Sequence, residues 1–248
     1  MDRLTVSLAA FASVVALVFA LVTADRWHRR RLAHHGAWTI AMALFFIGAG
    51  ALWWATASGW SDGVFRVFFT AGAVLNVAWL ALGTVALLAG NRVARPLRST
   101  LALLSAFAIG VMVIAPTKSP IVGDDIPRAR DHFGVLPRSL AAIGSGVPAL
   151  VIIFGALWSV ARLLKGSSPA VAGARRDVSI SANRLVLSNV LVALGTLVLS
   201  ASGSLAGRLG EVRAFTVTLS VGVVILFVGF LVPGARRSTA VLDATPSP

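Results

Sequence analysis

The chain has 248 residues, of which 57% are hydrophobic and 12% are charged, about half the charged fraction of a typical soluble domain. It contains no cysteine, which excludes disulfides, thiol catalysis and thiolate metal sites. The net charge of +13 does not indicate nucleic-acid binding, because the arginines lie in short clusters between apolar runs, as in a polytopic membrane protein. Arginine outnumbers lysine twenty to two, which suggests high-GC codon usage and a bacterial source.

Seven apolar runs follow one another along the chain, and each approaches the ~20 residues that cross a bilayer core of ~30 Å. Because backbone polar groups cannot stay unpaired in lipid, we expect each run to be a helix. The runs cover residues 4–23, 36–56, 65–90, 99–115, 139–164, 181–205 and 212–232. We predict an all-α integral membrane protein, a seven-transmembrane-helix bundle over residues 1–234, with a disordered cytoplasmic tail at 235–248.

The basic residues alternate between the connectors and predict the orientation. The C-terminal tail and the connectors after the first, third and fifth runs hold fourteen basic and three acidic residues; the other side holds eight basic and six acidic residues. The positive-inside rule then puts the N-terminus outside and the C-terminus inside a cell (plasma) membrane. We expect Arg26, Arg29, Arg30 and Arg31, after the first run, to contact anionic lipid headgroups at the cytoplasmic face.

The middle third of every predicted span lacks ionisable residues. Such residues are costly inside a membrane and usually functional. Their absence argues against a proton pump, an ion-coupled carrier with a buried carboxylate or a voltage sensor. The two lysines and four histidines all fall in connectors, which also argues against a retinal Schiff base or a membrane-embedded haem. We therefore expect no cofactor and no metal.

Neutral polar and small residues remain inside the spans. Asn76, Gly83 and Gly90 recur every seven residues, a spacing that favours close packing of helix backbones. The alternative is a polar ligand-binding cleft lined by Asn76 and Asn189. Trp79, which falls in mid-membrane, is either a packing residue or a ligand contact.

Two hairpins show a similar pattern. In each, Ala-Ser-Gly is followed by a polar turn and then by Arg-x-Phe at the start of the next run. The matched residues are Ala57, Ser58, Gly59, Arg66 and Phe68 in one hairpin and Ala201, Ser202, Gly203, Arg213 and Phe215 in the other. This pattern suggests a 3+1+3 repeat, an arrangement that occurs in seven-helix carriers.

The stretch "GDDIPRARDHF", residues 123–133, holds the densest group of charges. We expect it to form a short amphipathic helix, capped by Asp125 and lying on the outer membrane surface with Ile126, Ala129, Phe133 and Leu136 on its apolar face. The alternative is an enzymatic site. In that case Asp131 and His132 act as acid and base, and Arg128 and Arg130 hold an anion.

Three hypotheses for function follow. The first, which the neutral interior favours, is a membrane subunit without catalytic machinery that binds a partner, senses or plays an accessory role, alone or as a homodimer. The second is a carrier or binding protein for a small neutral or amphipathic ligand. The third is an outer-surface membrane enzyme that uses residues 124–132.

Overall fold

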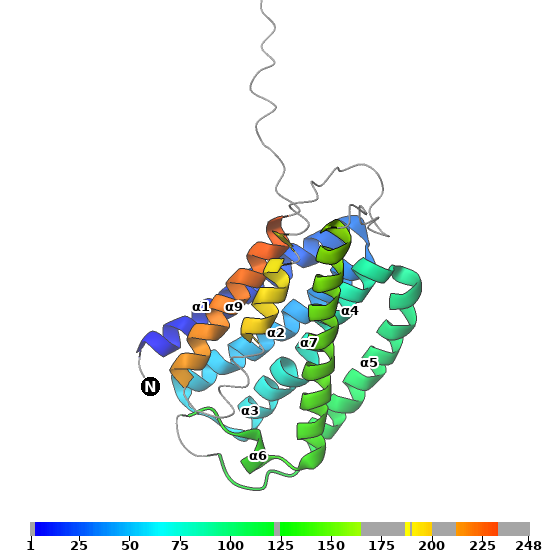
Figure 1. The fold of residues 1–248 in the computed structure, drawn as a ribbon. Helices are drawn as coiled ribbons and strands as arrows, with labels where there is room; N and C mark the ends of the chain where they lie inside the picture. Colours follow the sequence, from blue (N-terminus) through cyan, green and yellow to red (C-terminus); the bar gives the residue numbers. More distant parts are fainter. Residues whose placement is uncertain (1–2, 122–124, 165–186, 189, 200–211, 233–248) are drawn as a thin grey trace, which may run out of the picture.

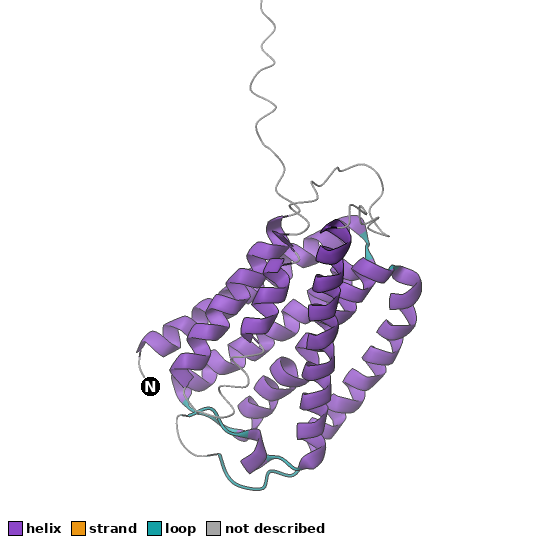
Figure 2. Ribbon diagram, viewed as in Figure 1, coloured by secondary structure: helices purple, strands orange, loops and turns teal. Residues whose placement is uncertain are grey.

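The computed structural model describes residues 3–121, 125–164, 187–188, 190–199 and 212–232, and all regular structure in these ranges is helical (Figure 2). Its elements are α1 (Arg3–Arg30), α2 (Ala33–Ser58), α3 (Asp62–Phe68), the π-helix η1 (Phe69–Leu75), α4 (Asn76–Ala89), α5 (Asn91–Ile114), α6 (Ala129–His132), α7 (Val135–Leu164) and α9 (Val212–Leu231). A further short apolar helix covers Val190–Leu199.

In the described part of the chain, six helices are long and apolar enough to cross a membrane, with α3, η1 and α4 counted as one continuous helix, Asp62–Ala89. The all-α prediction is confirmed for the described residues, and six of the seven apolar runs coincide with these helices. The seventh run, 181–205, lies partly outside the described residues, as the tail 235–248 lies wholly outside them. The described part of that run includes the helix Val190–Leu199, which is shorter than a span.

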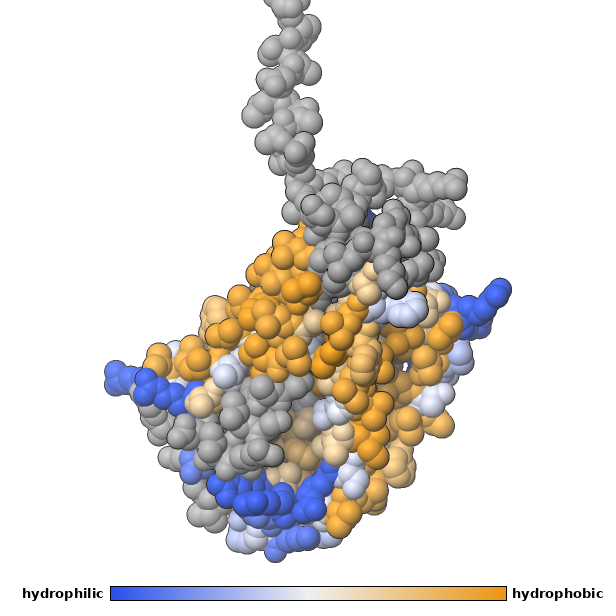
Figure 3. All heavy atoms as spheres, in the orientation of Figure 1, coloured by the Kyte–Doolittle hydropathy of each residue, from blue (hydrophilic) through white to orange (hydrophobic). Residues whose placement is uncertain are grey.

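The long helices pass alternately from one end of the bundle to the other (Figure 1). α1 packs along α2 and α9, while α4 lies between α2, α5 and α7. The α1–α2 turn and the α4–α5 turn lie at one end, which we call the basic end after the arginines in the last turns of α1 and just beyond it. The α2–α3 turn and the connector 115–134 lie at the other end, which we call the loop end. Figure 3 shows apolar side chains over the middle of the visible face and hydrophilic ones gathered at the loop end.

Glycines form the turns at both ends of the bundle. Gly59 ends α2 with φ of 93°, and its N–H bonds to the Ala55 carbonyl at 2.8 Å. Gly90 separates α4 from α5 with φ of 82°. Both φ values lie in the left-handed region, where a Cβ would add strain, so the two tight turns need glycine.

The two hairpins with the similar pattern meet in the bundle. The rings of Phe68 and Phe215 are in contact, with their centroids 5.9 Å apart. Their arginines differ, because Arg66 is largely buried in contacts with other segments, whereas Arg213 is exposed. Residues 201–203 lie outside the described residues, so the repeat stays a prediction.

Candidate functional site

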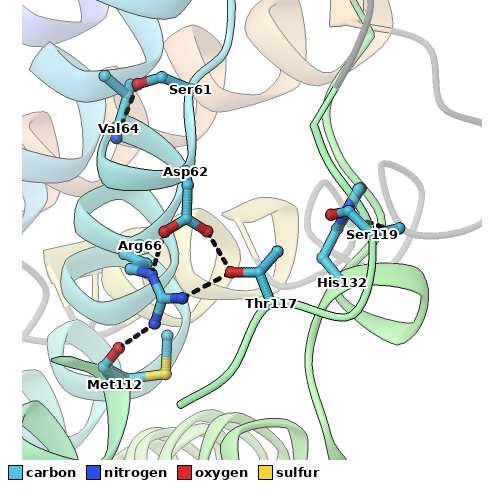
Figure 4. Close-up of polar contacts among 8 residues, drawn as sticks. All are labelled: Ser61, Asp62, Val64, Arg66, Met112, Thr117, Ser119 and His132. Carbon is cyan, nitrogen blue, oxygen red and sulfur yellow. Dashed lines mark hydrogen bonds and ion pairs between the residues drawn. The ribbon is translucent and has the colours of Figure 1, made fainter. Parts of the chain in front are cut away.

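Three side chains from two distant segments form a polar cluster at the loop end (Figure 4). Asp62 begins α3, and Arg66 lies one turn later, where its Nε donates to Asp62 Oδ2 at 2.6 Å. Thr117, in the connector after α5, donates its hydroxyl to Asp62 Oδ1 at 2.6 Å and accepts from Arg66 Nη2 at 2.6 Å. We call Asp62, Arg66 and Thr117 the loop-end cluster.

The local sequence explains why α3 begins here. The hydroxyl of Ser61 accepts a hydrogen bond from the Val64 N–H at 3.4 Å, which caps the helix. Asp62 lies in the first turn, where a negative charge interacts favourably with the helix dipole. The same turn places this carboxylate four residues before Arg66, the spacing at which side chains on a helix meet.

Arg66 also joins the cluster to α5. Its Nη1 donates to the Met112 carbonyl at 2.5 Å, and its guanidinium lies 5.5 Å from the centre of the Phe133 ring. The Arg66 side chain is 18% exposed, against 47% for Asp62. A guanidinium has five N–H donors. These contacts use three of them, so two have no partner among the described residues.

The connector 115–134 is anchored by apolar side chains under the loop end. Phe133 is fully buried and stacks on Phe65, with ring centroids 5.2 Å apart and planes 6° apart. Ile126 is buried in the same cluster. The predicted amphipathic helix was wrong in its extent, because α6 is one turn long and Phe133 has extended backbone. That extended backbone lets Phe133 pack into the bundle rather than onto a membrane surface.

His132 contacts Ser119, not the adjacent Asp131. Its Nδ1 lies 3.0 Å from the Ser119 carbonyl and 3.1 Å from the Ser119 hydroxyl oxygen (Figure 4). A carbonyl only accepts, so we assign the proton of the imidazole to Nδ1. The Ser119 hydroxyl in turn donates to the Asp131 carbonyl at 3.0 Å. Nδ1 therefore cannot take a proton from Ser119, and this arrangement does not activate that hydroxyl as a nucleophile.

The other charged residues of the predicted enzymatic site lie around α6. Arg130 and Asp131 form an ion pair at 3.4 Å, and both side chains are more than half exposed. Arg128 precedes α6, and its carbonyl accepts the Asp131 N–H at 2.9 Å. Within the described ranges, no three His, Asp or Glu side chains gather as they would around a metal ion.

The intramembrane candidates make contacts between helices. Asn76 is buried, and its Nδ2 donates to the Ala41 carbonyl of α2 at 3.1 Å. Trp79 is buried, and its Nε1 donates to the Ser105 hydroxyl of α5 at 3.1 Å. Asn189 lies outside the described residues. Sequence reasoning identified Asn76 and Trp79 as polar groups inside spans, but it could not identify their partners on neighbouring helices.

An apolar groove of about 260 Å³ lies between α2, α3, η1 and α5. Its walls are formed by Leu44, Ile47, Val67, Ala71, Leu75, Ile109, Met112 and Val113. Arg66 and Thr70 are the polar residues of the lining, and they are one helical turn apart. The Thr70 hydroxyl has no hydrogen-bond partner among the described residues, whereas the Thr84 hydroxyl bonds to the Leu80 carbonyl at 3.3 Å.

The π-helix forms one wall of the groove and is packed tightly on two sides. On one side Gly48 of α2 approaches the backbone of Gly72, where a Cβ would be 3.4 Å from the Gly72 nitrogen. On the other side Gly144 of α7 faces Val74, and a Cβ there would overlap the Val74 carbonyl. Short π-helical segments often occur at functional sites. The neighbouring glycines provide the space that this wider turn needs.

The arginines of the basic end have few acidic partners. Arg29 Nε donates to both oxygens of Asp25, at 2.8 and 2.9 Å. Arg26 Nη1 donates to the Phe230 carbonyl at 3.3 Å, where a cation at the C-terminus of α9 is favourable. The Arg31 guanidinium lies 5.7 Å from the Trp27 ring centre, and Arg30 is exposed.

Trp38 holds α2 against α4 near the basic end. Its ring packs on Gly83, where any Cβ would overlap the indole, and its Nε1 donates to the Leu80 carbonyl at 3.3 Å. The same ring contacts Phe230 of α9, with centroids 5.3 Å apart. The buried His35 contacts the edge of this aromatic group.

The loop-end cluster and the groove were both missed by sequence reasoning. The spacing of Asp62 and Arg66 was the one available signal, since a pair four residues apart on a helix commonly interacts. Nothing in the sequence links either residue to Met112 or Thr117, about fifty positions away. No protein-family model, no curated protein and no solved structure matches this chain.

Proposed function

We propose that this chain is a non-catalytic integral membrane protein that binds an amphipathic molecule from the bilayer, in a sensing or accessory role. The observation that carries the proposal is the groove between α2, α3, η1 and α5. Ile47, Val67, Ile109 and Val113 form its rim and are exposed on the outside of the bundle. A lipid-like molecule in the bilayer can therefore enter sideways, without passing through water.

The surface of the groove is almost wholly apolar, which suits a hydrocarbon chain, and the two polar residues in its lining both lie toward the loop end. The polar residues of the lining, Arg66 and Thr70, belong to the loop-end part of the groove, whereas Leu75 lies nine residues after Arg66. Even with a smaller rise in the π-helix, that separation is on the order of 10 Å along the helix. A molecule with its polar end near the membrane surface and a hydrocarbon chain toward the bilayer centre fits this arrangement. The ligand class matches the second hypothesis from the sequence, and the non-catalytic role matches the first.

The test is the thermal stability of the purified protein in detergent with a library of amphiphiles. A ligand at a hundred times its Kd stabilises a folded protein by about 2.7 kcal/mol. We expect one or more amphiphiles to raise the Tm of the wild type but not of an Ile47→Trp, Ile109→Trp variant, in which two large rings fill the groove. Leu103→Trp, on the exposed face of α5 outside the groove lining, is the matched control.

Either of two results would contradict the proposal. In the first, no amphiphile stabilises the wild type. In the second, the stabilising amphiphiles raise the Tm of the groove-filled variant as much as that of Leu103→Trp.

We also propose the orientation with the N-terminus outside, seven spans and the basic end at the cytoplasmic face of a bacterial cell membrane. The clustering of Arg26, Arg29, Arg30 and Arg31 at one end of the bundle supports this orientation. The absence of native cysteine permits a clean test with single-cysteine variants. A membrane-impermeant maleimide should label Ser119→Cys in intact cells and Arg31→Cys only after the membrane is opened. The reverse pattern would invert the orientation.

A second candidate function is partner binding through α7, by another membrane protein or by a second copy of this chain. α7 is the least covered of the long helices in the described part of the bundle. Leu157, Phe154 and Trp158 are all more than half exposed on it. A Phe154→Ala, Trp158→Ala variant should convert a dimer in detergent to a monomer by light scattering. A wild type that is monomeric at every detergent concentration would reject the homodimer.

A further inference from the structure

We infer that the first turns of α5 form a binding site for anionic phospholipids of the membrane leaflet at the basic end. The site consists of Arg92, Arg95 and Arg98, which we call the α5 arginines. This inference goes beyond the proposed function, because it concerns the lipid around the protein and not the occupant of the groove. It depends on the helix that carries the three arginines, on their lack of partners and on their depth in the membrane.

The α5 arginines lie on a helix, although the sequence places them in a connector between two apolar runs. α5 begins at Asn91, so all three side chains extend from its first eight residues. Residues three apart on an α-helix differ by about 60° around the axis and by ~4.5 Å along it. The three Cα atoms therefore share about a third of the circumference, and the charges extend toward one side of α5.

The α5 arginines have no partner within the described part of the chain. All three are exposed, and none of their guanidiniums takes part in a hydrogen bond or an ion pair with a described residue. The arginines of α1 differ in this respect. Arg29 bonds to both oxygens of Asp25, and Arg26 donates to the Phe230 carbonyl. The α5 arginines thus keep their N–H donors and their full charge for an external group.

This segment is an unfavourable place for positive charge in the absence of an anion. Arg92 lies in the first turn of α5, where the positive end of the helix dipole disfavours a cation. That turn contains no acidic residue. Residues three apart on a helix are neighbours, so each arginine also repels the next. An anionic headgroup beside the α5 arginines would offset both costs.

The depth of the arginines favours a lipid headgroup over a partner in the aqueous phase. The apolar part of α5 begins at Leu101, three residues after Arg98. At 1.5 Å per residue, Arg98 and Arg95 lie ~4.5 and ~9 Å beyond this point. The headgroup layer is about 5–8 Å thick on each side of the hydrocarbon core, and long arginine side chains can reach it from either level. Val93 and Leu97 are exposed on the same turns, which suits the boundary between headgroups and hydrocarbon.

The experiment measures the lipid preference of the full-length protein by native mass spectrometry in detergent. Dioleoyl phosphatidylglycerol and dioleoyl phosphatidylcholine, which share both chains but differ in headgroup charge, are added in equal amounts. Each arginine near anionic lipid should raise the affinity about fivefold, so we expect at least tenfold more bound phosphatidylglycerol. Equal binding of the two lipids would overturn the inference and leave an acidic partner protein as the alternative for these arginines.

The test variant replaces all three α5 arginines by glutamine, which removes the charge from exposed side chains. We expect its preference for phosphatidylglycerol to fall at least tenfold. The matched control makes the same replacement at three arginines near the loop end: Arg128→Gln, Arg130→Gln and Arg138→Gln. It should lower the preference less than twofold. Equal losses in the two variants would overturn the inference, because net charge alone would then explain the preference.

A second variant replaces the α5 arginines by lysine. Attraction to an anionic leaflet depends on charge, so this variant should retain the preference of the wild type within threefold. A lysine variant as weak as the glutamine variant would overturn the electrostatic basis of the site.

Hydrogen exchange then locates the lipid on the protein. In phosphatidylcholine nanodiscs that contain phosphatidylglycerol, the amides of residues 91–100 should exchange at least threefold more slowly than in phosphatidylcholine alone, because bound headgroups stabilise the first turns of α5. Peptides from the α2–α3 turn at the loop end are the internal control and should be unchanged. Equal exchange of residues 91–100 in both lipid mixtures would overturn the placement of the site. The groove proposal is independent of this result, because none of these arginines lines the groove.

Discussion

The two ends of the bundle contain the same short motif, an aspartate followed four residues later by an arginine, and use it differently. At the basic end Asp25 and Arg29 are 56% and 75% exposed and bond to each other. At the loop end Arg66 is 18% exposed and donates to Met112 and Thr117 as well as to Asp62. An exposed pair contributes little to stability, whereas a shielded arginine that joins three segments leaves several groups unsatisfied when it is removed. Spacing alone therefore does not predict the energetic importance of such a pair.

The largest expected effect on stability comes from replacing the arginine of each Asp–Arg pair by alanine. Arg66→Ala should lower the free energy of unfolding by about 2–4 kcal/mol, because it leaves the carbonyl of the buried Met112 without its donor and removes the link between α3, α5 and the connector. Arg29→Ala should cause no measurable change, since the Arg29 side chain is itself exposed and bonds only to Asp25 among the described residues. Reversible unfolding in mixed detergent and SDS measures both. Equal losses in the two variants would mean that shielding does not distinguish the two pairs.

The next largest effect is expected at the basic end, where we expect the stability of the bundle to depend on side-chain packing and not on an ion pair. Gly83→Ala forces a Cβ against the Trp38 indole and should cost about 1–3 kcal/mol in the same assay. Gly110→Ala, in α5 with open space around the added Cβ, should be neutral or stabilising by up to about 1 kcal/mol. A tolerated alanine at Gly83 would show that the contact with Trp38 does not determine how closely α2 and α4 approach.

A smaller effect should follow from Thr117→Val, which keeps the shape of the side chain and removes both of its hydrogen bonds in the loop-end cluster. We expect a loss of about 1 kcal/mol and faster proteolytic cleavage within the connector 115–134. Limited proteolysis of the protein in nanodiscs measures the second effect. An unchanged cleavage rate would indicate that Phe133 and Ile126 hold the connector without help from the cluster.

The smallest effect concerns lipid at the basic end. Arg30 and Arg31 have no acidic partner among the described residues, so we expect them to attract anionic headgroups at about 1 kcal/mol per residue. A combined Arg30→Gln, Arg31→Gln variant should retain less phosphatidylglycerol after purification, measured by native mass spectrometry. Asp62→Asn serves as the comparison at the opposite end, where no loss is expected. Equal phosphatidylglycerol retention in the arginine variant and the wild type would contradict this role.

Hydropathy predicted most of the fold, because burying a helix in lipid requires a long apolar run and little else. Hydropathy predicted the ends of the helices less accurately. α5 begins at Asn91, eight residues before the predicted run. A helix can continue through polar residues such as Arg92 and Arg95 where it extends beyond the hydrocarbon layer. The candidate site was harder to predict. Hydrogen bonds join Asn76 to Ala41 and Arg66 to Met112 and Thr117, positions that lie far apart in the sequence. A hydropathy profile does not indicate which distant residues form such pairs.

The π-helix has one more consequence. A turn closed by hydrogen bonds five residues apart holds more residues than an α-helical turn, so it changes the angular position of everything that precedes it relative to everything that follows. Between Asp62 and Ala89, one continuous helix can thus aim Arg66 at α5 and Asn76 at α2. Deleting a single residue within Phe69–Leu75 would rotate α3 about its axis and turn Arg66 away from Met112, although every side chain of the loop-end cluster would still be present. The alignment of the polar cluster therefore depends on the number of residues in a segment that contains none of its members.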